Sequence, residues 1–221
     1  MQISLANETV VITGGAKRVG RAIAELCAAS GANVAITYNT SRDEAQQFIG
    51  ELHSEYSHQK FAAFPLEVSD AKACAELPHR VLESIGSATA LVNSAAIFRR
   101  TPFETMTESD FDDHINANLK GPYLLDKSFG DYFLQKQRGS IINIGDIHGM
   151  KPLKNYVPYC VSKSGVITLT EALAKALAPH VRVNCICPGT ILLPSEEQGE
   201  DSEYSDDEAQ LKNRVPMQRF G

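Results

Sequence analysis

Three side chains in the second half of the chain have the types and spacing of an acid–base site. Asp146 follows the apolar, β-branched segment 140–145, and Tyr159 and Lys163 are spaced by four residues. This spacing brings both side chains to one face of a helix, so the lysine ammonium can lie close to the tyrosine phenol. A nearby cation favours the phenolate and lowers a phenol pKa that starts near about 10. Tyr159 is therefore a candidate proton donor or acceptor.

The charge of Asp146 indicates which acceptor such a site would reduce. An ionised carboxylate only accepts hydrogen bonds, so it cannot donate one to a carbonyl oxygen that becomes negative on reduction. A C=N acceptor is the opposite case, because its nitrogen gains a proton and its cationic form accepts hydride more readily. At about 4 Å and an effective dielectric near 20, a carboxylate favours that cation by roughly 4 kcal/mol. An Asp146 that is protonated, or that turns away to cap the next segment, is the alternative.

Short β-branched segments alternate with amphipathic segments along the chain and would hold these residues in place. Near-continuous apolar strands separated by helices are typical of a parallel sheet covered on both faces. We therefore expect a Rossmann-type, doubly wound α/β fold, with its ligand crevice at the carboxyl ends of the strands. The expected strands are 9–13, 33–38, 60–67, 89–93, 140–145 and 181–187, and the clearest helical segments are 21–30 and 166–178.

Length and composition limit the classes of protein to which the chain can belong. Its 221 residues, 43% hydrophobic and 22% charged, fit one domain spanning residues 1–221. No apolar stretch approaches the about 20 residues that cross a bilayer, and the N-terminus lacks the pattern of a secretory signal, so we expect a cytoplasmic protein. No basic stripe is present to bind nucleic acid. The cysteines include no CxxC pair, which argues against a metal site or disulfide framework: Cys27, Cys74, Cys160, Cys185 and Cys187.

A glycine-rich turn, TGGAKRVG, follows the first expected strand at residues 13–20. Gly14, Gly15 and Gly20 permit a tight turn and close approach of the backbone to a pyrophosphate at a helix N-terminus. A plain strand-to-helix turn is the alternative, but the position between a strand and a helix is the one that a nucleotide loop requires. The residues that we assign to the cofactor here are Gly14, Lys17, Arg18, Val19 and Gly20.

The end of the second expected strand bears on the choice of cofactor. A free ribose 2′-hydroxyl is usually bound by an acid about 20 residues after the glycines, whereas a 2′-phosphate requires cations. This strand ends instead in uncharged residues, Tyr38, Asn39, Thr40 and Ser41. The nearby cations are Lys17, Arg18 and Arg42, with a solvent-facing Arg42 as the alternative. The pattern favours NADP over NAD.

These motifs together resemble the short-chain dehydrogenase/reductase family over the whole chain. The resemblance rests on five segments in the order found in the family: TGGAKRVG, VNSAA (92–96), NANLKG (116–121), Tyr159-x-x-x-Lys163 and VNCICPGT (183–190). It implies that Asn118 holds a proton-relay water and that Asn93 supports the central strands. The implied cofactor contacts are Glu67 and Val68 by the adenine, Asn93 and Ala95 after the fourth strand, Lys163 at the ribose, and Pro188, Gly189 and Thr190 beside the nicotinamide.

Two departures from the family pattern resemble its pteridine reductase branch. Arg18 stands where most members have glycine, and Asp146 where most have serine. Phe98 matches a phenylalanine that stacks on the pterin in that branch, with core packing as the alternative, and Arg18 would reach both cofactor and pterin. The resemblance implies an NADPH-dependent reductase of a dihydropterin or dihydrofolate C=N without a metal. Its catalytic residues would be Asp146, Tyr159, Lys163 and Asn118, and its substrate contacts Phe98, Arg18, Asp146 and Tyr159.

Two other functions fit the same residues. The protein could reduce a carbonyl, such as that of a 3-oxoacyl thioester, or it could be a non-catalytic NADP-binding subunit. The family resemblance also implies a homo-oligomer, which would be a tetramer in its full-length form. Relatives continue past RVPMQRFG with a helix and a seventh strand, so we expect a chain truncated before the last strand. Residues 195–208 carry eight acids and no Lys or Arg. We expect 190–212 to form a substrate lid that repels the glutamate tail of a folate.

Overall fold

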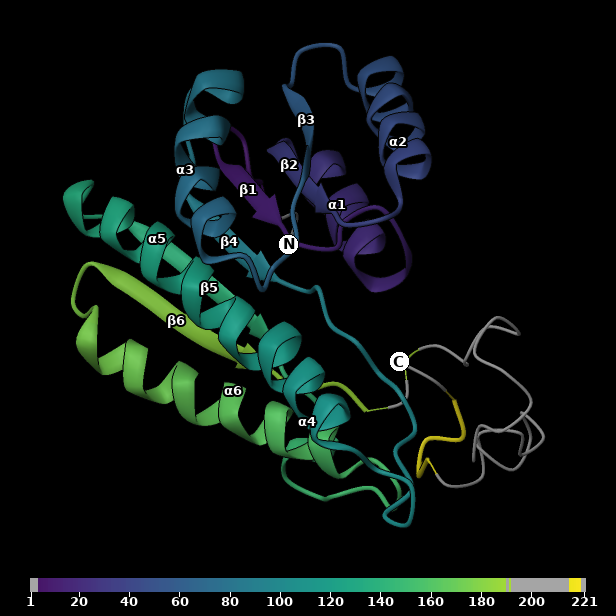
Figure 1. The fold of residues 1–221 in the computed structure, drawn as a ribbon. Coiled ribbons are helices and arrows are strands. Elements are labelled where there is room, and N and C mark those ends of the chain that lie inside the picture. The colour runs from purple at the N-terminus through teal and green to yellow at the C-terminus, as the bar shows by residue number, and fades with distance from the viewer. Residues whose placement is uncertain (1–3, 190, 192–214, 220–221) are drawn as a thin grey trace.

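The computed structural model describes residues 4–189, 191 and 215–219 of the chain. Its sheet has six parallel strands in the order β3-β2-β1-β4-β5-β6 (Figure 1). The strands are β1 (Thr9–Ile12), β2 (Asn33–Tyr38), β3 (Phe61–Pro65), β4 (Ala90–Asn93), β5 (Gly139–Ile144) and β6 (Val181–Ile186). Because the order reverses between β1 and β4, the predicted doubly wound α/β fold is confirmed. Of the expected lid, 190–212, all residues except Ile191 lie outside the described part.

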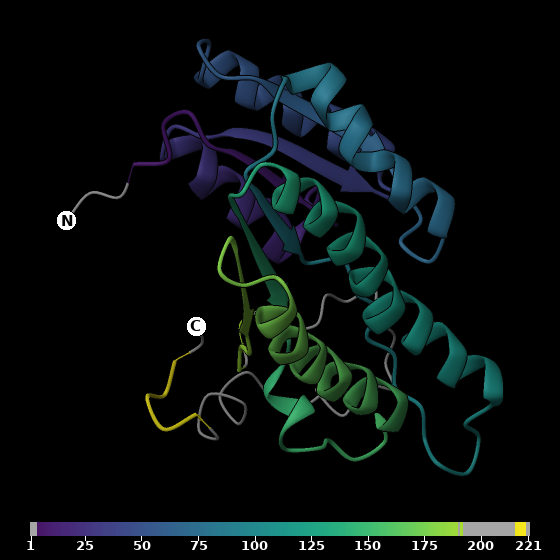
Figure 2. The same ribbon diagram turned by 90° about the vertical axis from the view of Figure 1, so that its left-hand side faces the viewer.

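Helices cover both faces of this sheet (Figures 1 and 2). One apolar cluster joins the first strands to α1 and α2, and a second joins the sheet to α3, α5 and α6. The helices are α1 (Arg18–Ala29), α2 (Arg42–Glu55), α3 (Ala71–Ile85), α4 (Glu108–Ile115), α5 (Gly121–Gln135) and α6 (Val157–Ala176). Burial on both faces explains why β1 and β2 read as continuous apolar runs, whereas β6 alternates buried and exposed residues.

Helix α6 begins nine residues earlier than its apolar periodicity indicates. The sequence pattern predicts a helix from residue 166, whereas α6 starts at Val157 with a proline in its first turn. Proline is favoured there because its fixed φ suits a helix and its missing N–H has no partner in the first turn. The serines and glycine of the first turns have low helix propensity, which hides this segment from a periodicity argument. These turns carry Tyr159 and Lys163.

A buried polar cluster ties the strand ends beneath the site. Asn93 donates to Asp126 at 2.6 Å and to Asn143 Oδ1 at 2.8 Å, and Asn143 donates to Asp126 at 3.0 Å and to Thr170 at 3.0 Å. These residues come from β4, α5, β5 and α6, so the cluster links two strands to two helices. Burial raises the pKa of Asp126 to about 7, although the amide donors of Asn143 and Asn93 lower it.

The raised pKa of Asp126 should make the protein less stable as the pH rises from about 4 to about 7. In that range Asp126 has lost its proton in the unfolded protein but keeps it in the folded protein. The rising pH therefore stabilises the unfolded state and lowers the free energy of unfolding, on the order of 4 kcal/mol in all. We expect the free energy of unfolding in urea to fall less across this range in Asp126→Asn than in the wild type. Parallel pH dependences of the two proteins would contradict this prediction.

Candidate active site

A cavity of about 810 Å³ opens at the carboxyl ends of the strands. Its lining comes from the segments that follow all six strands and from the first turns of α1 and α6. This is the edge of the sheet at which doubly wound folds bind their ligands. Seventeen of the residues predicted from the sequence line it: Gly14, Lys17, Arg18, Val19, Gly20, Asn39, Thr40, Ser41, Glu67, Val68, Ala95, Phe98, Asp146, Tyr159, Lys163, Pro188 and Gly189.

Three predicted site residues are not in this lining. Asn93 is 3% exposed and its side chain is bonded within the buried polar cluster, where it can support the strands, so its expected contact with the cofactor stays a prediction. Asn118 is also buried, as described below. Thr190 lies outside the described residues, so its expected contact with the nicotinamide stays a prediction.

The glycine-rich turn has the shape of a phosphate cradle. A Cβ on Gly20 would lie 2.3 Å from the main-chain oxygen of Gly14, and one on Gly15 would lie 2.5 Å from Ile36. Gly14 has a φ of +64°, which favours glycine. Lys17, the N-cap of α1, makes no side-chain capping bond, and Arg18, Val19 and Gly20 of the first turn line the cavity. The turn therefore fits the pyrophosphate of a dinucleotide.

Gly20→Ala tests this cradle. Because the added methyl would collide with main chain, we expect the turn to shift and NADPH affinity to fall by roughly 10²-fold, measured by cofactor fluorescence. Gly50→Ala is the matched control, because nothing lies within 4 Å of a Cβ at this position in α2. It should leave NADPH affinity unchanged and stabilise the helix by about 1 kcal/mol. Equal affinities for both variants would contradict a role of this turn in cofactor binding.

Two cations expected at a ribose 2′-phosphate line the cavity. Lys17 pairs with Glu44 at 2.6 Å, and both side chains are about half exposed. Arg18 has a φ of +51°, the left-handed region that glycine prefers, which explains why glycine is usual at this position. Arg42 does not line the cavity, so its predicted approach to the cofactor is not seen. Asn39 donates to Glu67 at 2.5 Å across the ends of β2 and β3.

Asp146 joins the tyrosine to the turn that follows β5. Its Oδ2 accepts a hydrogen bond of 2.6 Å from Tyr159 Oη, and its Oδ1 accepts one of 2.7 Å from the main-chain N–H of His148. Both oxygens accept, as those of an ionised carboxylate do. The two alternatives foreseen for this side chain, capping and facing the tyrosine, therefore occur together.

Lys163 lies deep in the same site. It is 5% exposed, donates to the carbonyl of Ile144 at 2.7 Å and lies 5.9 Å from the centre of the Tyr159 ring. Burial lowers the pKa of Lys163 to about 8, and the charge of Asp146 opposes this shift. The lysine is thus an ammonium below about pH 8 and an amine above it.

The state of Lys163 should set an alkaline limb in the rate of NADPH consumption. The ammonium stabilises a Tyr159 phenolate, and this support is lost as the pH rises past about 8. Lys163→Arg keeps a positive charge at all these pH values, so we expect a slower enzyme that lacks this limb. If the rate fell at the same alkaline pH in the wild type and in Lys163→Arg, the titrating group would be one other than Lys163.

Phe98 lines the cavity and also packs against neighbouring aromatic rings. Its ring stacks on Tyr156 with centres 4.6 Å apart and planes at 9°, and it meets the edge of Tyr159 at 4.7 Å. Phe98 also lines the cavity, so it forms an apolar wall beside the acid–base tyrosine. The alternative of packing against neighbouring rings is thus seen, and the predicted contact of Phe98 with the substrate stays a prediction.

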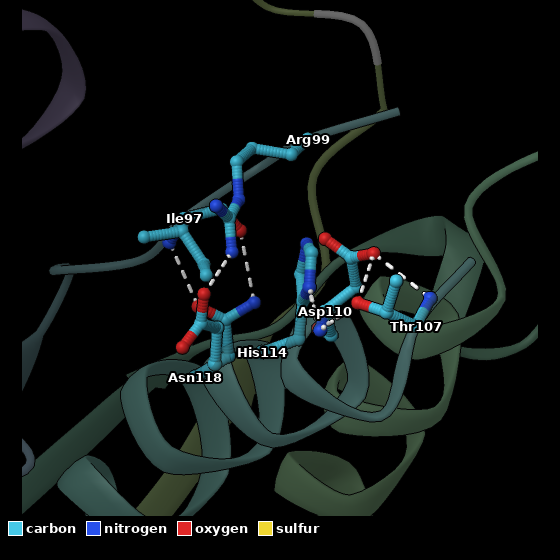
Figure 3. A network of polar contacts seen from close by, with 7 residues as sticks. Ile97, Arg99, Thr107, Asp110, His114 and Asn118 are labelled. Atoms are coloured by element: carbon cyan, nitrogen blue, oxygen red, sulfur yellow. Dashed lines mark hydrogen bonds and ion pairs between the residues drawn. The ribbon is translucent and has the colours of Figure 1, made fainter. Parts of the chain in front are cut away.

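Asn118 lies in a π-helical turn, Asn116–Lys120, between α4 and α5. Its side chain accepts from the N–H of Ile97 at 2.8 Å and donates to the carbonyl of Ile97 at 2.9 Å (Figure 3). It also donates to Ser162 at 3.1 Å. The side chain is thus occupied in fixing the segment after β4. Its expected role in a proton relay would have to use the main chain of this turn, and it stays a prediction.

The sequence argument missed an ion pair at the edge of the cavity. Arg99, next to Phe98, lies 2.5 Å from Asp113 of α4, and both residues line the cavity. The two consecutive arginines after Phe98 are visible in the sequence, but Asp113, the partner of Arg99, is fourteen residues away.

Within the described part of the chain, no helix is long and apolar enough to span a bilayer, and no group of three or more His, Cys, Asp or Glu is arranged as metal ligands would be.

Comparisons with known proteins agree with this geometry. Residues 8–203 match the family model for short chain dehydrogenases. The 3-oxoacyl-[acyl-carrier-protein] reductase FabG of Thermotoga maritima is 33% identical over 98% of this chain and 86% of its own length, and that of Staphylococcus epidermidis is 31% identical over 97% and 86%. A crystal structure of a dehydrogenase/reductase from Sinorhizobium meliloti 1021 superposes with a TM-score of 0.85 and 29% identity, covering 100% of this chain and 84% of the other. The chain belongs to the short-chain dehydrogenase family of nicotinamide-dependent oxidoreductases.

Proposed function

We propose that the protein is an NADPH-dependent pteridine reductase, which converts a dihydropterin or dihydrofolate to its tetrahydro form. The observation that carries the proposal is the 2.6 Å hydrogen bond from Tyr159 Oη to Asp146 Oδ2 in the cavity. An anionic acceptor, rather than a hydroxyl donor, is thus next to the acid–base tyrosine. Such a site favours an acceptor that becomes positive and opposes one that becomes negative.

Each side chain in the cavity would have its own role in the reduction. NADPH, when bound, supplies the hydride to the carbon of the C=N bond. Asp146 stabilises the protonated ring nitrogen, and the proton shared between Asp146 and Tyr159 is the one available for transfer to it. Lys163 compensates the negative charge left on Tyr159. Phe98 supplies a flat apolar wall for a heteroaromatic ring and excludes water on that side.

The preference for NADPH over NADH is part of the proposal. No carboxylate ends β2, and the uncharged Asn39, Thr40 and Ser41 line the cavity there. Lys17 and Arg18 line the same cavity and supply positive charge, and Lys17 reaches Glu44 in α2, the helix that begins directly after Ser41. A 2′-phosphate gains from both features, whereas a free 2′-hydroxyl lacks its usual acidic partner.

A second candidate is reduction of a 3-oxoacyl thioester. The names of the FabG relatives favour it, because these proteins are 31% and 33% identical over almost all of this chain. Tyr159 and Lys163 would serve a carbonyl equally well. The acceptor oxygens of Asp146 would not, because they repel the oxyanion that forms. A non-catalytic subunit has less support, since Tyr159, Lys163 and Asp146 all meet in the cavity.

One assay separates these candidates. Loss of NADPH absorbance is followed with dihydrobiopterin, dihydrofolate and a 3-oxoacyl thioester in parallel, and each is repeated with NADH. We expect turnover with the dihydropterins and a preference for NADPH. Consumption with the thioester alone would establish the second candidate, and tight NADPH binding without turnover of any substrate would indicate the non-catalytic subunit.

A further inference from the structure

Two cysteines lie together at the end of β6. The sulfurs of Cys185 and Cys187 are 3.7 Å apart, and both side chains are partly exposed. The two residues are two positions apart along an extended segment. Their Cα–Cα distance is therefore at the upper end of the range that a disulfide can join. Cys187 lies just beyond the last residue of β6, and the carbonyls of its two neighbours, Ile186 and Pro188, accept hydrogen bonds from the segment after β5.

Gly145 leaves the room that the two thiols occupy. A Cβ on this residue would lie 2.7 Å from the sulfur of Cys185 and 2.8 Å from that of Cys187. Any other residue here would push the sulfurs away, so the pair is packed against the segment that joins β5 to Asp146. The N–H of Gly145 also bonds to the carbonyl of Ile186, between the two cysteines, at 2.8 Å.

The pair is connected to the cofactor side of the cavity. Pro188 and Gly189, which follow directly, line the cavity, and the carbonyl of Pro188 accepts from the N–H of Ile147 at 3.0 Å. A negative charge on either thiol would raise the pKa of Lys163, so both sulfurs lie within electrostatic reach of its ammonium. A change in the conformation of residues 185–187 would therefore shift Pro188 and Gly189 and alter the electrostatic surroundings of Lys163.

We propose that Cys185 and Cys187 are a redox-active dithiol, which a small-molecule disulfide such as glutathione disulfide oxidises to an intrachain disulfide that weakens NADPH binding. The thiolate of Cys187 attacks one sulfur of glutathione disulfide, and one glutathione thiolate leaves. The thiolate of Cys185 then attacks the sulfur of Cys187 and releases the second glutathione. The two cysteines lose two electrons and two protons, which the two released glutathione thiols carry away.

The assignment of the attacking thiol follows from the surroundings of Cys185. Burial raises the pKa of Cys185 to about 11, and its contact with Cys187 adds to the shift, so its thiolate is scarce at neutral pH. In the proposed sequence Cys187 attacks first and Cys185 is the resolving thiol. To form the bond, the sulfurs must approach from 3.7 Å to about 2.05 Å, which draws the end of β6 away from its present position beside Gly145.

The test uses the full chain and does not depend on the substrate. The protein is incubated with glutathione disulfide, the remaining thiols are alkylated, and peptides are analysed by mass spectrometry, while NADPH affinity is measured by fluorescence. We expect a Cys185–Cys187 disulfide, several-fold weaker NADPH binding, and recovery of both properties on addition of a dithiol reductant. Cys185→Ser should stop at a glutathione adduct on Cys187. Cys27→Ser, remote in α1, should behave as the wild type.

Two results would overturn the inference. One is alkylation of both Cys185 and Cys187 after exposure to the oxidant, which would show that the disulfide does not form. The other is a disulfide with no change in NADPH affinity, which would show that it has no effect on the site. The wild-type protein alone decides both points, so the conclusion stands even where a variant folds poorly. Neither outcome bears on whether the substrate is a pterin, which the substrate assay settles separately.

Discussion

Asp146→Ser is expected to reverse the substrate preference of the enzyme. With a dihydropterin, kcat/KM should fall by about 10²- to 10³-fold, because the variant loses a carboxylate that favours the cationic C=N by roughly 4 kcal/mol. With a 3-oxoacyl thioester, kcat/KM should rise, since the serine hydroxyl can donate to the developing oxyanion. Steady-state NADPH consumption with both substrates measures the two effects in one preparation.

Asp146→Asn is the matched control for charge. An asparagine has nearly the same shape and can still accept from the N–H of His148, so the turn after β5 should keep its conformation. It carries no charge, so we expect a loss with dihydropterin close to that of the serine variant. If the asparagine variant instead retained wild-type turnover, the carboxylate charge would have no part in the reaction, and the preference for a C=N substrate would lose its physical basis.

Tyr159→Phe should lower kcat by about 10²- to 10⁴-fold, the usual contribution of a positioned acid or base. The phenolic proton that Asp146 now accepts at 2.6 Å would be missing, while the ring still packs against Phe98. NADPH affinity, measured by fluorescence, should therefore change little. A variant that binds NADPH normally but turns over slowly separates proton transfer from cofactor binding.

Tyr156→Phe provides the comparison for Tyr159→Phe. Tyr156 lies three residues earlier, is 2% exposed and stacks on Phe98, but it does not line the cavity. We expect its turnover to stay within several-fold of the wild type. If Tyr159→Phe were no slower than Tyr156→Phe, another group would be the proton donor.

The sheet and its ligand edge could be predicted from the sequence because they depend on local patterns. Apolar, β-branched runs separated by helical segments define parallel strands, and the residues after each strand then meet at one edge. Gly14 and Asp146 are predicted in this way, Tyr159 and Lys163 are predicted from their four-residue spacing, and all four line the cavity. Apolar periodicity predicts α6 only from residue 166, because its first turns have weak helix formers, and the helix under Tyr159 and Lys163 rests on their spacing alone.

The contacts that the sequence could not give are those between residues distant along the chain. The amide of Asn118 bonds to the main chain of Ile97, twenty-one residues earlier, and its side chain is not among the residues that line the cavity. Asn93 turns into the buried polar cluster because Asp126 lies behind the strand. No spacing rule relates these partners, since their approach depends on how helices α4 and α5 pack on the sheet.

The dual bonding of Asp146 was foreseen only as two separate alternatives. Capping of the turn after β5 and contact with Tyr159 appeared exclusive on the sequence, because each would need the side chain in one direction. The two oxygens of the carboxylate satisfy both at once, at 2.7 Å and 2.6 Å. The cap fixes the carboxylate, so its position beside the tyrosine does not depend on the substrate.

The most direct test of the central claim is a crystal structure of the protein with NADP and a bound dihydropterin. The measurement is the distance from Asp146 to the ring nitrogen that gains the proton. We predict that a carboxylate oxygen lies within about 3 Å of that nitrogen and that the pterin ring packs against Phe98. A carboxylate turned out of the cavity, or a pterin bound with its C=N bond away from Asp146, would contradict the account.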